Sequence, residues 1–520
     1  MTSQYKLFNG RSVTFLVFVP LTMLILAGTG CSRHSGSTDE SEAAAAAEIP
    51  TDANGGSTDH PNIILILADD LGYGDIAAYN EQSQIPTPSL DSLAARGMRF
   101  TAAHSSSAVC TPSRYGILTG QYSWRTWLKK GVLEGYDKSL IDPDTPTIAS
   151  FLKSNGYNTA AVGKWHLGFG SKAETEFLTP PDVRPTTLGF DEFYGIASSL
   201  DIPPYAFIKN GVFDERPTEK VEQKRGGDEI DGFWYWREGP IAPSFDFHTT
   251  DQVLTDKAVQ YIAEQSNKTK PFFLYFALTA PHTPLVPRDE FIGASDAGVY
   301  GDFVAQMDAS VSRVLDALEK SGESDNTIVI VTSDNGAVAY SYLQNHGHAP
   351  NGEWRGMKSQ LFEGGHRIPL IVSWPGIFEV GVSERPVSLV DFFATFAELL
   401  DVPLGSAAPD SRSFADVLTA KDESLLPRRD FIVSHSLYGT FGIQHGDWKL
   451  IMDDESGGFG DSEIPEGGVF WHGEPLVHTR DQWQLYNLRE DPKESRNLLT
   501  ERPVVVDQLV GLLENIKDGK

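Results

Sequence analysis

One of the two cysteines of this chain begins the string CTPSRYGILTG at residues 110–120. Pro112 suits the first turn of a helix there, because proline lacks an N–H that would be unpaired in that turn. Cys110 would then lie at the positive end of the helix, where the dipole lowers a thiol pKa and favours anions. Arg114 would lie about one turn further on and face the same anion. The string therefore predicts cysteine chemistry beside an anion site, with a buried cysteine before an ordinary helix as the alternative.

Polar residues follow two apolar runs that have the pattern of buried parallel strands, at residues 63–68 and 328–331. In open α/β sheets, functional sites form at the carboxyl edge, so we expect these residues to lie together. Their oxygens suit Ca²⁺ or Mg²⁺, with calcium favoured, and without a cation we expect the carboxylates to repel one another. Each pair taken alone would more simply be a strand-to-loop turn. The residues are Asp69, Asp70, Asp334 and Asn335.

Basic groups and histidines occupy similar positions elsewhere in the chain. Lys164 and His166 follow a short strand-like run, and in an extended segment their side chains would point the same way. His282 follows the apolar run at residues 271–278, and Lys358 lies in a loop. Taken singly, each would more often be a surface or core residue, but together they could bind an anion.

These motifs resemble those of the type I sulfatases, a formylglycine-dependent family of the alkaline phosphatase superfamily. The resemblance runs from about Pro61 to about residue 515, and Gln121 departs from the Arg or Lys that many members carry. It implies that Cys110 is oxidised to formylglycine by a formylglycine-generating or anaerobic sulfatase-maturating enzyme. The implied calcium ligands are Asp69, Asp70, Asp334, Asn335 and the formylglycine at Cys110. The implied catalytic residues are Cys110, Arg114, Lys164, His166, His282, Asp334 and Lys358.

The resemblance also implies a reaction. One hydroxyl of the formylglycine hydrate, deprotonated with help from Asp334 and calcium, would attack the sulfur of a sulfate ester. Arg114 and Lys164 would hold formylglycine and sulfate. His282 or Lys358 would protonate the departing oxygen. His166 would then deprotonate the second hydroxyl, which expels sulfate and re-forms the aldehyde.

The 520 residues include 42 basic and 71 acidic side chains, which gives a formal net charge of −29. Such a surface excludes nucleic acid as a partner, because phosphates need a basic face. It also opposes sulfated glycans at long range, so an anion site must be locally positive.

The N-terminus predicts export to the periplasm, or to the cell surface as an outer-membrane lipoprotein of a bacterium. Basic residues precede an apolar run at 13–26, and small residues lead to Cys31, as at a lipoprotein cleavage site. Lipidation of Cys31 would be the only membrane anchor, and with Cys110 modified no disulfide remains. We expect a signal peptide at 1–31, a flexible linker at 32–60, a catalytic domain at 61–405 and a C-terminal subdomain at 406–520.

The order of the patterns predicts an α/β fold with a large, mainly parallel sheet sandwiched by helices, as in alkaline phosphatase. Helical patterns lie at 88–96, 147–154, 304–318 and 389–400. Short strand patterns at 431–434, 441–444, 448–451 and 483–486, with a helix at 504–516, predict a small antiparallel C-terminal sheet and a terminal helix.

The substrate is the least determined part of the prediction. The chain resembles bacterial arylsulfatases similar to N-acetylgalactosamine-6-sulfatase, which implies a sulfated polysaccharide or oligosaccharide, of 6-O-sulfated galactose or N-acetylgalactosamine type. A phosphodiesterase or phosphonate monoester hydrolase of the same superfamily, and a catalytically silent glycan-binding lipoprotein, are the alternatives. Candidate sugar-site residues, each of which taken singly would more often be structural, are Trp124, Arg125, Asp201, Tyr205, His346 and His348.

Overall fold

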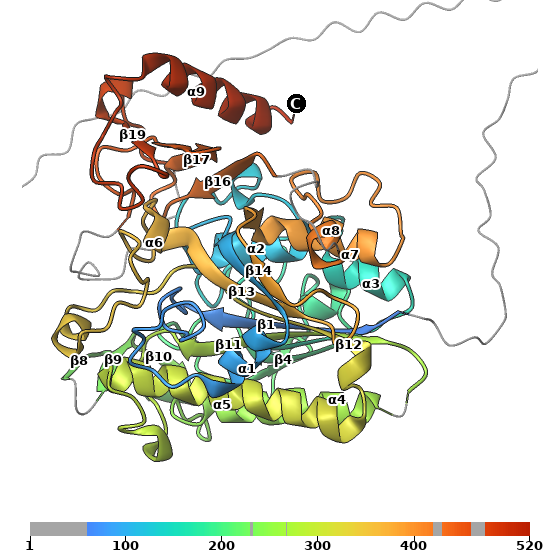
Figure 1. The fold of residues 1–520 in the computed structure, drawn as a ribbon. Coiled ribbons are helices and arrows are strands. Elements are labelled where there is room, and N and C mark those ends of the chain that lie inside the picture. The colour runs from blue at the N-terminus through green and yellow to red at the C-terminus, as the bar shows by residue number, and fades with distance from the viewer. Residues whose placement is uncertain (1–59, 229–231, 267, 420–428, 459–473, 520) are drawn as a thin grey trace, which may run out of the picture. The chain divides into compact units, whose positions relative to one another are not determined.

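The computed structural model describes residues 60–228, 232–266, 268–419, 429–458 and 474–519. Its main element is an 11-stranded sheet with the order β14-β2-β13-β12-β1-β11-β3-β4-β5-β6, in which β15 also pairs with β2 (Figure 1). The central strands, in sheet order, are β12 (Thr327–Ser333), β1 (Asn62–Asp69), β11 (Phe272–Pro281), β3 (Asn158–Lys164) and β4 (Glu192–Ile196). These central strands are parallel, which confirms the expected mainly parallel α/β sheet.

Helices cover both faces of this sheet (Figure 1). The longer ones are α1 (Pro88–Ala95), α2 (Cys110–Thr119), α3 (Ile148–Ser154), α4 (Thr250–Gln265), α5 (Gly298–Ser321) and α7 (Phe392–Leu399), with the short α6 (Glu363–His366) and α8 (Ala415–Thr419). Side chains of β1 alternate between two hydrophobic cores, since successive residues of a strand face opposite sides. Ile63 and Leu65 pack with α2, α3 and α7, whereas Ile64 and Ile66 pack with α4 and α5.

Antiparallel strands extend the sheet on both sides. β13 (Arg367–Ser373) pairs with β12 and with β2 (Met98–His104), and the sequence analysis identified neither β13 nor β2. Pro369 explains why β13 is hard to recognise: it cannot donate to the ladder, and the register shifts between Ile368 and Leu370. The other strands at the two edges are β5 (Ile208–Lys209), β6 (Val212–Phe213), β14 (Gly381–Ser383) and β15 (Val387–Ser388). Two separate pairs are β7 (Glu219–Val221) with β10 (Gly239–Ile241), and β8 (Lys224–Asp228) with β9 (Gly232–Trp236).

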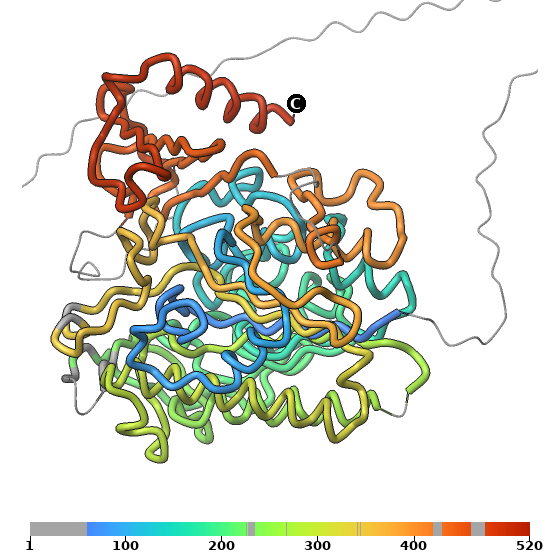
Figure 2. The backbone as a smooth tube through the Cα atoms, in the orientation of Figure 1, coloured from blue at the N-terminus to red at the C-terminus, as the bar shows by residue number. Residues whose placement is uncertain are grey.

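A small antiparallel sheet follows near the C-terminus, shown in red tones in Figures 1 and 2. Its strands, in sheet order, are β16 (Phe431–His435), β17 (Phe441–His445), β18 (Trp448–Ile451) and β19 (Gln484–Asn487). The terminal helix α9 (Pro503–Lys517) begins with a proline, which suits the first turn, and packs Leu509 and Leu513 against this sheet. The antiparallel sheet and terminal helix are confirmed, whereas the domain boundary at residue 405 stays a prediction.

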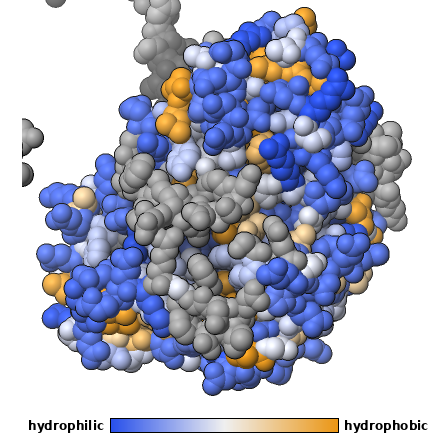
Figure 3. All heavy atoms as spheres, turned by 90° about the vertical axis from the view of Figure 1, so that its left-hand side faces the viewer, coloured by the Kyte–Doolittle hydropathy of each residue, from blue (hydrophilic) through white to orange (hydrophobic). Residues whose placement is uncertain are grey.

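The predicted signal peptide, the Cys31 lipidation site and all of the linker except His60 lie outside the described residues. Within the described ranges, no helix is long and apolar enough to cross a membrane. The face shown in Figure 3 is mainly hydrophilic, with only small hydrophobic patches among polar side chains, as the acidic composition leads us to expect.

A buried ionic cluster joins the C-terminal sheet to the catalytic sheet. Lys449 on β18 lies 2.8 Å from Glu363 Oε1 and 2.8 Å from Glu494 Oε1, and its side chain is 2% exposed. Arg367 at the start of β13 also pairs with Glu363, at 2.8 Å. Burial raises the pKa of Glu494 to about 7, although Lys449 opposes that rise. Lys449 is therefore the cation that the two buried glutamates share, and Glu363 has Arg367 as a second partner.

Replacing Lys449 with methionine removes this cation and leaves two buried carboxyl groups facing each other. Losing one partner of a buried ion pair costs roughly 3–5 kcal/mol. We expect Lys449→Met to lower the free energy of unfolding in urea by about that amount. The matched control is Lys493→Met, because Lys493 is an exposed lysine next to Glu494 in the sequence. Equal stability of the two variants would contradict this role of Lys449.

Candidate active site

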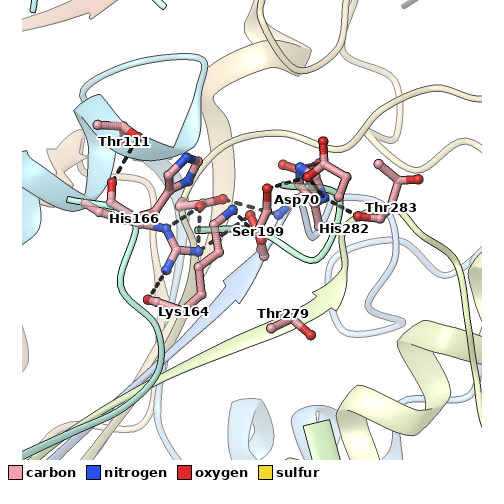
Figure 4. Close-up of polar contacts among 12 residues, drawn as sticks. Asp70, Thr111, Lys164, His166, Ser199, Thr279, His282 and Thr283 are labelled. Carbon is pink, nitrogen blue, oxygen red and sulfur yellow. Dashed lines mark hydrogen bonds and ion pairs between the residues drawn. The ribbon is translucent and has the colours of Figure 1, made fainter. Parts of the chain in front are cut away.

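The carboxyl ends of neighbouring parallel strands place most of the predicted site residues in one buried pocket (Figure 4). Asp69 ends β1, and Asp334 follows β12, the strand paired with β1 up to Ala68 and Ser333. Lys164 ends β3 and His282 follows β11. The expectation that the two acidic pairs meet at one edge of the sheet is therefore confirmed.

Cys110 is the first residue of α2 and is 2% exposed. Pro112 lies in the first turn, as predicted, and the helix ends at Gly120, whose φ of 62° is a left-handed cap that glycine adopts without strain. Burial raises the pKa of the Cys110 thiol, although Lys164 and Lys358 oppose this rise. The expected lowering by the helix dipole is thus wrong, since desolvation of the thiolate is the larger effect. An unmodified Cys110 is not an activated nucleophile in this setting.

Each carboxylate of the pocket is paired with a cation. Lys164 Nζ lies 2.6 Å from Asp69 Oδ2, and Lys358 Nζ lies 2.8 Å from Asp70 Oδ2. The Arg114 guanidinium binds Asp334 Oδ2 through Nε at 2.9 Å and Nη2 at 2.8 Å. The predicted repulsion among the carboxylates is present, because the charge of Asp69 raises the pKa of Asp334, but the three paired cations offset it.

The pairing also sets the protonation of these groups. Burial by itself raises the pKa of Asp69, but Lys164, His282 and Arg114 together bring it below its usual value. Burial and the charge of Asp69 raise the pKa of Asp334. Burial alone would lower the pKa of Lys358, yet the neighbouring Asp70 raises it, so this lysine is a firm cation.

The carboxylates and Asn335 also fit a divalent cation. One oxygen from each of Asp69, Asp70 and Asp334 lies within 4.8 Å of the others. Asp69 Oδ1 and Asn335 Oδ1 are buried and accept no hydrogen bond from the described residues. Unsatisfied buried oxygens are costly unless a cation binds them, and an all-oxygen donor set suits Ca²⁺ or Mg²⁺.

His166 lies just beyond β3 and has a φ of 55°. The segment is therefore not extended there, so the expectation that Lys164 and His166 share one face of a strand is wrong. His166 Nε2 lies 2.8 Å from the Leu133 carbonyl, which can only accept, so Nε2 carries the proton. Burial lowers the pKa of His166 far below its usual value, and Lys164 adds to this effect. The buried Nδ1 makes no hydrogen bond with the described residues and is a neutral proton acceptor.

His282 is held by its own loop. Its Nδ1 lies 2.6 Å from the Thr283 carbonyl and its Nε2 lies 3.8 Å from Asp70 Oδ2, so Nε2 faces the carboxylates. Ser199 lies between the side chains of Lys164 and Asp70 in Figure 4 and hydrogen-bonds Asp201. The sequence analysis missed Ser199, because β4 is only five residues long and its strand signal is weak. The signal that the sequence offered was a serine three residues after the end of β4, at the same edge of the sheet as the other site residues.

The predicted sugar-site residues fall into two groups. Asp201 lies 3.9 Å from His282 Nδ1, and Tyr205 donates to the Asp201 carbonyl at 3.0 Å, so this pair adjoins the pocket. The others contact parts of the chain that are not catalytic. Trp124 stacks on Tyr122, Arg125 pairs with Asp410, His346 lies against the Asp296 carbonyl, and His348 contacts Asp75. Their roles toward a substrate stay predictions.

Comparison with known proteins agrees with this geometry. The sulfatase family model matches residues 61–402. An N-acetylgalactosamine-6-O-sulfatase of Bacteroides thetaiotaomicron is 36% identical over 499 residues, which cover 89% of this chain and 94% of that protein. The N-acetylgalactosamine-6-sulfatase of Canis lupus familiaris is 35% identical over 365 residues, or 69% of this chain and 65% of that protein.

A solved structure from work on the metabolism of multiple glycosaminoglycans by Bacteroides thetaiotaomicron has a TM-score of 0.76 at 33% identity, and the match covers 88% of this chain and 100% of that chain. The fold, the pocket and these similarities agree with one another. The chain belongs to the sulfatase family and is a sulfuric ester hydrolase.

Proposed function

We propose that this sulfatase is exported and removes the 6-O-sulfate of N-acetylgalactosamine or galactose units in a sulfated polysaccharide or oligosaccharide. The relatives named for N-acetylgalactosamine-6-sulfate support this substrate, and one of them matches nearly the whole chain. Export, with or without a lipid on Cys31, and maturation of Cys110 by a formylglycine-generating or anaerobic maturating enzyme are parts of the same proposal.

The observation that carries the proposal is the charge balance of the pocket. Asp69, Asp70 and Asp334 are matched by Lys164, Lys358 and Arg114, so a divalent cation held there would leave two positive charges unbalanced. The negative charge of a sulfate monoester would offset part of this excess positive charge, and the greater negative charge of released sulfate would offset more of it. The pocket thus becomes locally positive inside a protein whose net charge is −29.

The proposed ligands of the cation, calcium in preference to magnesium, are Asp69, Asp70, Asp334, Asn335 and residue 110 as formylglycine. Together, the cation and the formylglycine hydrate would supply an activated hydroxyl for attack on sulfur, charge stabilisation of the sulfuryl oxygens, and a second hydroxyl whose deprotonation would release sulfate.

The side chains of this chain perform the remaining tasks. Arg114 is fixed by Asp334 and by the Lys164 carbonyl, which it contacts at 3.0 Å, so its orientation is set before substrate arrives. Lys164 and Lys358 supply positive charge in a buried pocket, where the effective dielectric is low and the charge acts strongly. His282 Nε2 faces the Asp70 carboxylate, which pairs with Lys358. Both His282 Nε2 and Lys358 are placed to protonate the departing sugar oxygen. Neutral His166 Nδ1 is the proton acceptor for release of sulfate.

A screen of defined sulfated saccharides tests the substrate. We expect faster sulfate release from N-acetylgalactosamine-6-sulfate than from the 4-sulfate or from glucosamine-6-sulfate, measured by ion chromatography. A Cys110→Ala preparation from the same host is the control for contaminating sulfatases. Phosphate diesters and phosphonate monoesters are assayed in parallel. Faster turnover of these esters, or preference for another sulfate position, would contradict the proposal.

Replacing Asp334 with asparagine tests the cation site. Asparagine keeps the shape and one acceptor but removes the charge that binds both the cation and Arg114. We expect a loss of sulfate release of roughly 100-fold or more. Elemental analysis should show that one divalent cation per chain is lost, and the metal-free variant should melt below metal-free wild type because Arg114 loses its main partner.

The matched control is Asp325→Asn, an exposed aspartate just ahead of β12. It should keep wild-type activity and cation content. Near wild-type turnover of Asp334→Asn, or no divalent cation in the active wild-type enzyme, would show that the proposed site is wrong.

A further inference from the structure

Among the described residues, two groups of possible metal ligands lie outside the active site, and the one that includes an unsatisfied buried carboxylate oxygen is beside the C-terminal sheet. Asp453 and Asp454 follow β18, and His478 precedes β19. One ligand atom from each of the three lies within 4.8 Å of the others. The two neighbouring strands thus bring together an N/O donor set that the sulfatase reaction does not use.

The contacts inside this group leave two buried atoms unsatisfied. Asp453 Oδ2 and His478 Nε2 lie 3.2 Å apart, yet neither forms a hydrogen bond with the other or with any described residue. The Asp453 side chain is only 4% exposed, so water does not easily replace the missing partner. His478 Nδ1 lies 3.1 Å from Asp454 Oδ1, which favours the tautomer with its proton on Nδ1. In that tautomer, Asp453 Oδ2 and His478 Nε2 each keep a lone pair available for a metal ion.

A metal ion bound between Asp453 Oδ2 and His478 Nε2 would satisfy both of these buried atoms. Two ligands about 2.1 Å from a zinc-sized ion lie about 3.0–3.4 Å apart in octahedral or tetrahedral geometry, and the measured separation falls in this range. Metal-binding histidines commonly donate their other N–H to a carboxylate, and Asp454 is positioned for that contact.

Neighbouring groups hold both carboxylates in place. Asp453 Oδ1 accepts from the Glu455 N–H at 2.9 Å, and Asp454 Oδ2 accepts from Gln482 Nε2 at 3.1 Å. Gln484 donates to the backbone carbonyls of Asp453 and Glu455, at 2.9 and 2.6 Å. The free oxygen of Asp453 is therefore oriented toward His478 by its surroundings rather than by chance.

We propose that Asp453 and His478, supported by Asp454, bind one divalent transition-metal ion, Zn²⁺ or Mn²⁺. A mixed imidazole and carboxylate set suits these ions, in contrast to the all-oxygen set of the active site, which suits calcium or magnesium. Two carboxylates with a neutral imidazole carry a charge of −2, which a divalent ion neutralises.

The site has a structural consequence for the catalytic pocket. The chain segments next to the proposed metal site hold the loop that contains Leu437 and Tyr438. The Tyr438 N–H donates to the Gly457 carbonyl at 3.1 Å, and the Leu476 N–H donates to the Tyr438 carbonyl at 3.0 Å. Leu437 in turn packs in the hydrophobic cluster that contains Cys110. An ion bridging the two segments therefore stabilises the wall next to the nucleophile.

Calorimetric titration with ZnCl₂ or MnCl₂ of chelator-treated full-length protein tests the proposal. The background is a Cys110→Ala, Asp334→Asn double variant, which removes ligands from the two metal-binding groups of the active site. We expect one Zn²⁺ or Mn²⁺ per chain and a rise in melting temperature on binding. His478→Gln and Asp453→Asn should each lower the affinity at least about 10-fold.

The matched control is His445→Gln, an exposed histidine on β17, which should bind the ion like its parent. Metal-free melting temperatures near that of the parent show that the variants are folded. If Zn²⁺ and Mn²⁺ do not bind, or if binding survives both substitutions, the proposal is wrong and His478 is instead a protonated bridge between the two aspartates. Sulfate release by the otherwise wild-type enzyme is measured separately, so failure of this site is distinguishable from failure of the proposed substrate.

Discussion

Three ion pairs buried at the carboxyl edge of the parallel sheet are the interaction on which the rest of this structure depends. Each pair joins an acidic residue at or just after the end of β1 or β12 to a cation from another element: α2, β3 or the loop that carries Lys358. The cost of desolvating buried charges can exceed what their pairing returns, so such an arrangement is poor evidence for stability. Its value is geometric, because each charged group is fixed by its partner before any ligand arrives.

The same pairs explain how an acidic protein can act on a sulfate ester. The net charge of −29 repels anions at a distance, but solution ions screen that field within about 10 Å. Inside the buried pocket, salt ions screen charges only weakly, so the charge balance there depends on the nearby side chains. With the acidic side chains already neutralised by Lys164, Lys358 and Arg114, any bound divalent cation acts as uncompensated positive charge. Electrostatic stabilisation of the transferring sulfuryl group then does not require a basic surface.

Much of the site could be predicted from the sequence, because the central strands are continuous apolar runs whose polar ends must meet at one edge. That argument correctly placed Asp69 beside Asp334 and Lys164. It could not reveal the backbone turn at His166, the antiparallel strand containing Pro369, or Ser199 after a short strand. Each of these depends on long-range packing that leaves little local pattern.

Electrostatic expectations based on single elements were less successful for the same reason. The helix dipole at Cys110 was considered without the effect of burial, and the repulsion among the carboxylates was considered without the neighbouring cations. In the folded protein, burial of Cys110 outweighs the dipole, and cations from α2, β3 and the loop of Lys358 offset the repulsion. Charges in a buried pocket have to be counted together, not one motif at a time.

A raised thiol pKa makes unmodified Cys110 a weak nucleophile, so the central claim is that residue 110 acts only after oxidation to formylglycine. Mass spectrometry of the peptide spanning Cys110, taken from preparations of graded specific activity, measures this directly. The account predicts that sulfate release rises in proportion to the fraction of peptide in which the thiol mass is replaced by an aldehyde or its hydrate. Full activity in a preparation that contains only unmodified cysteine at position 110 would contradict it.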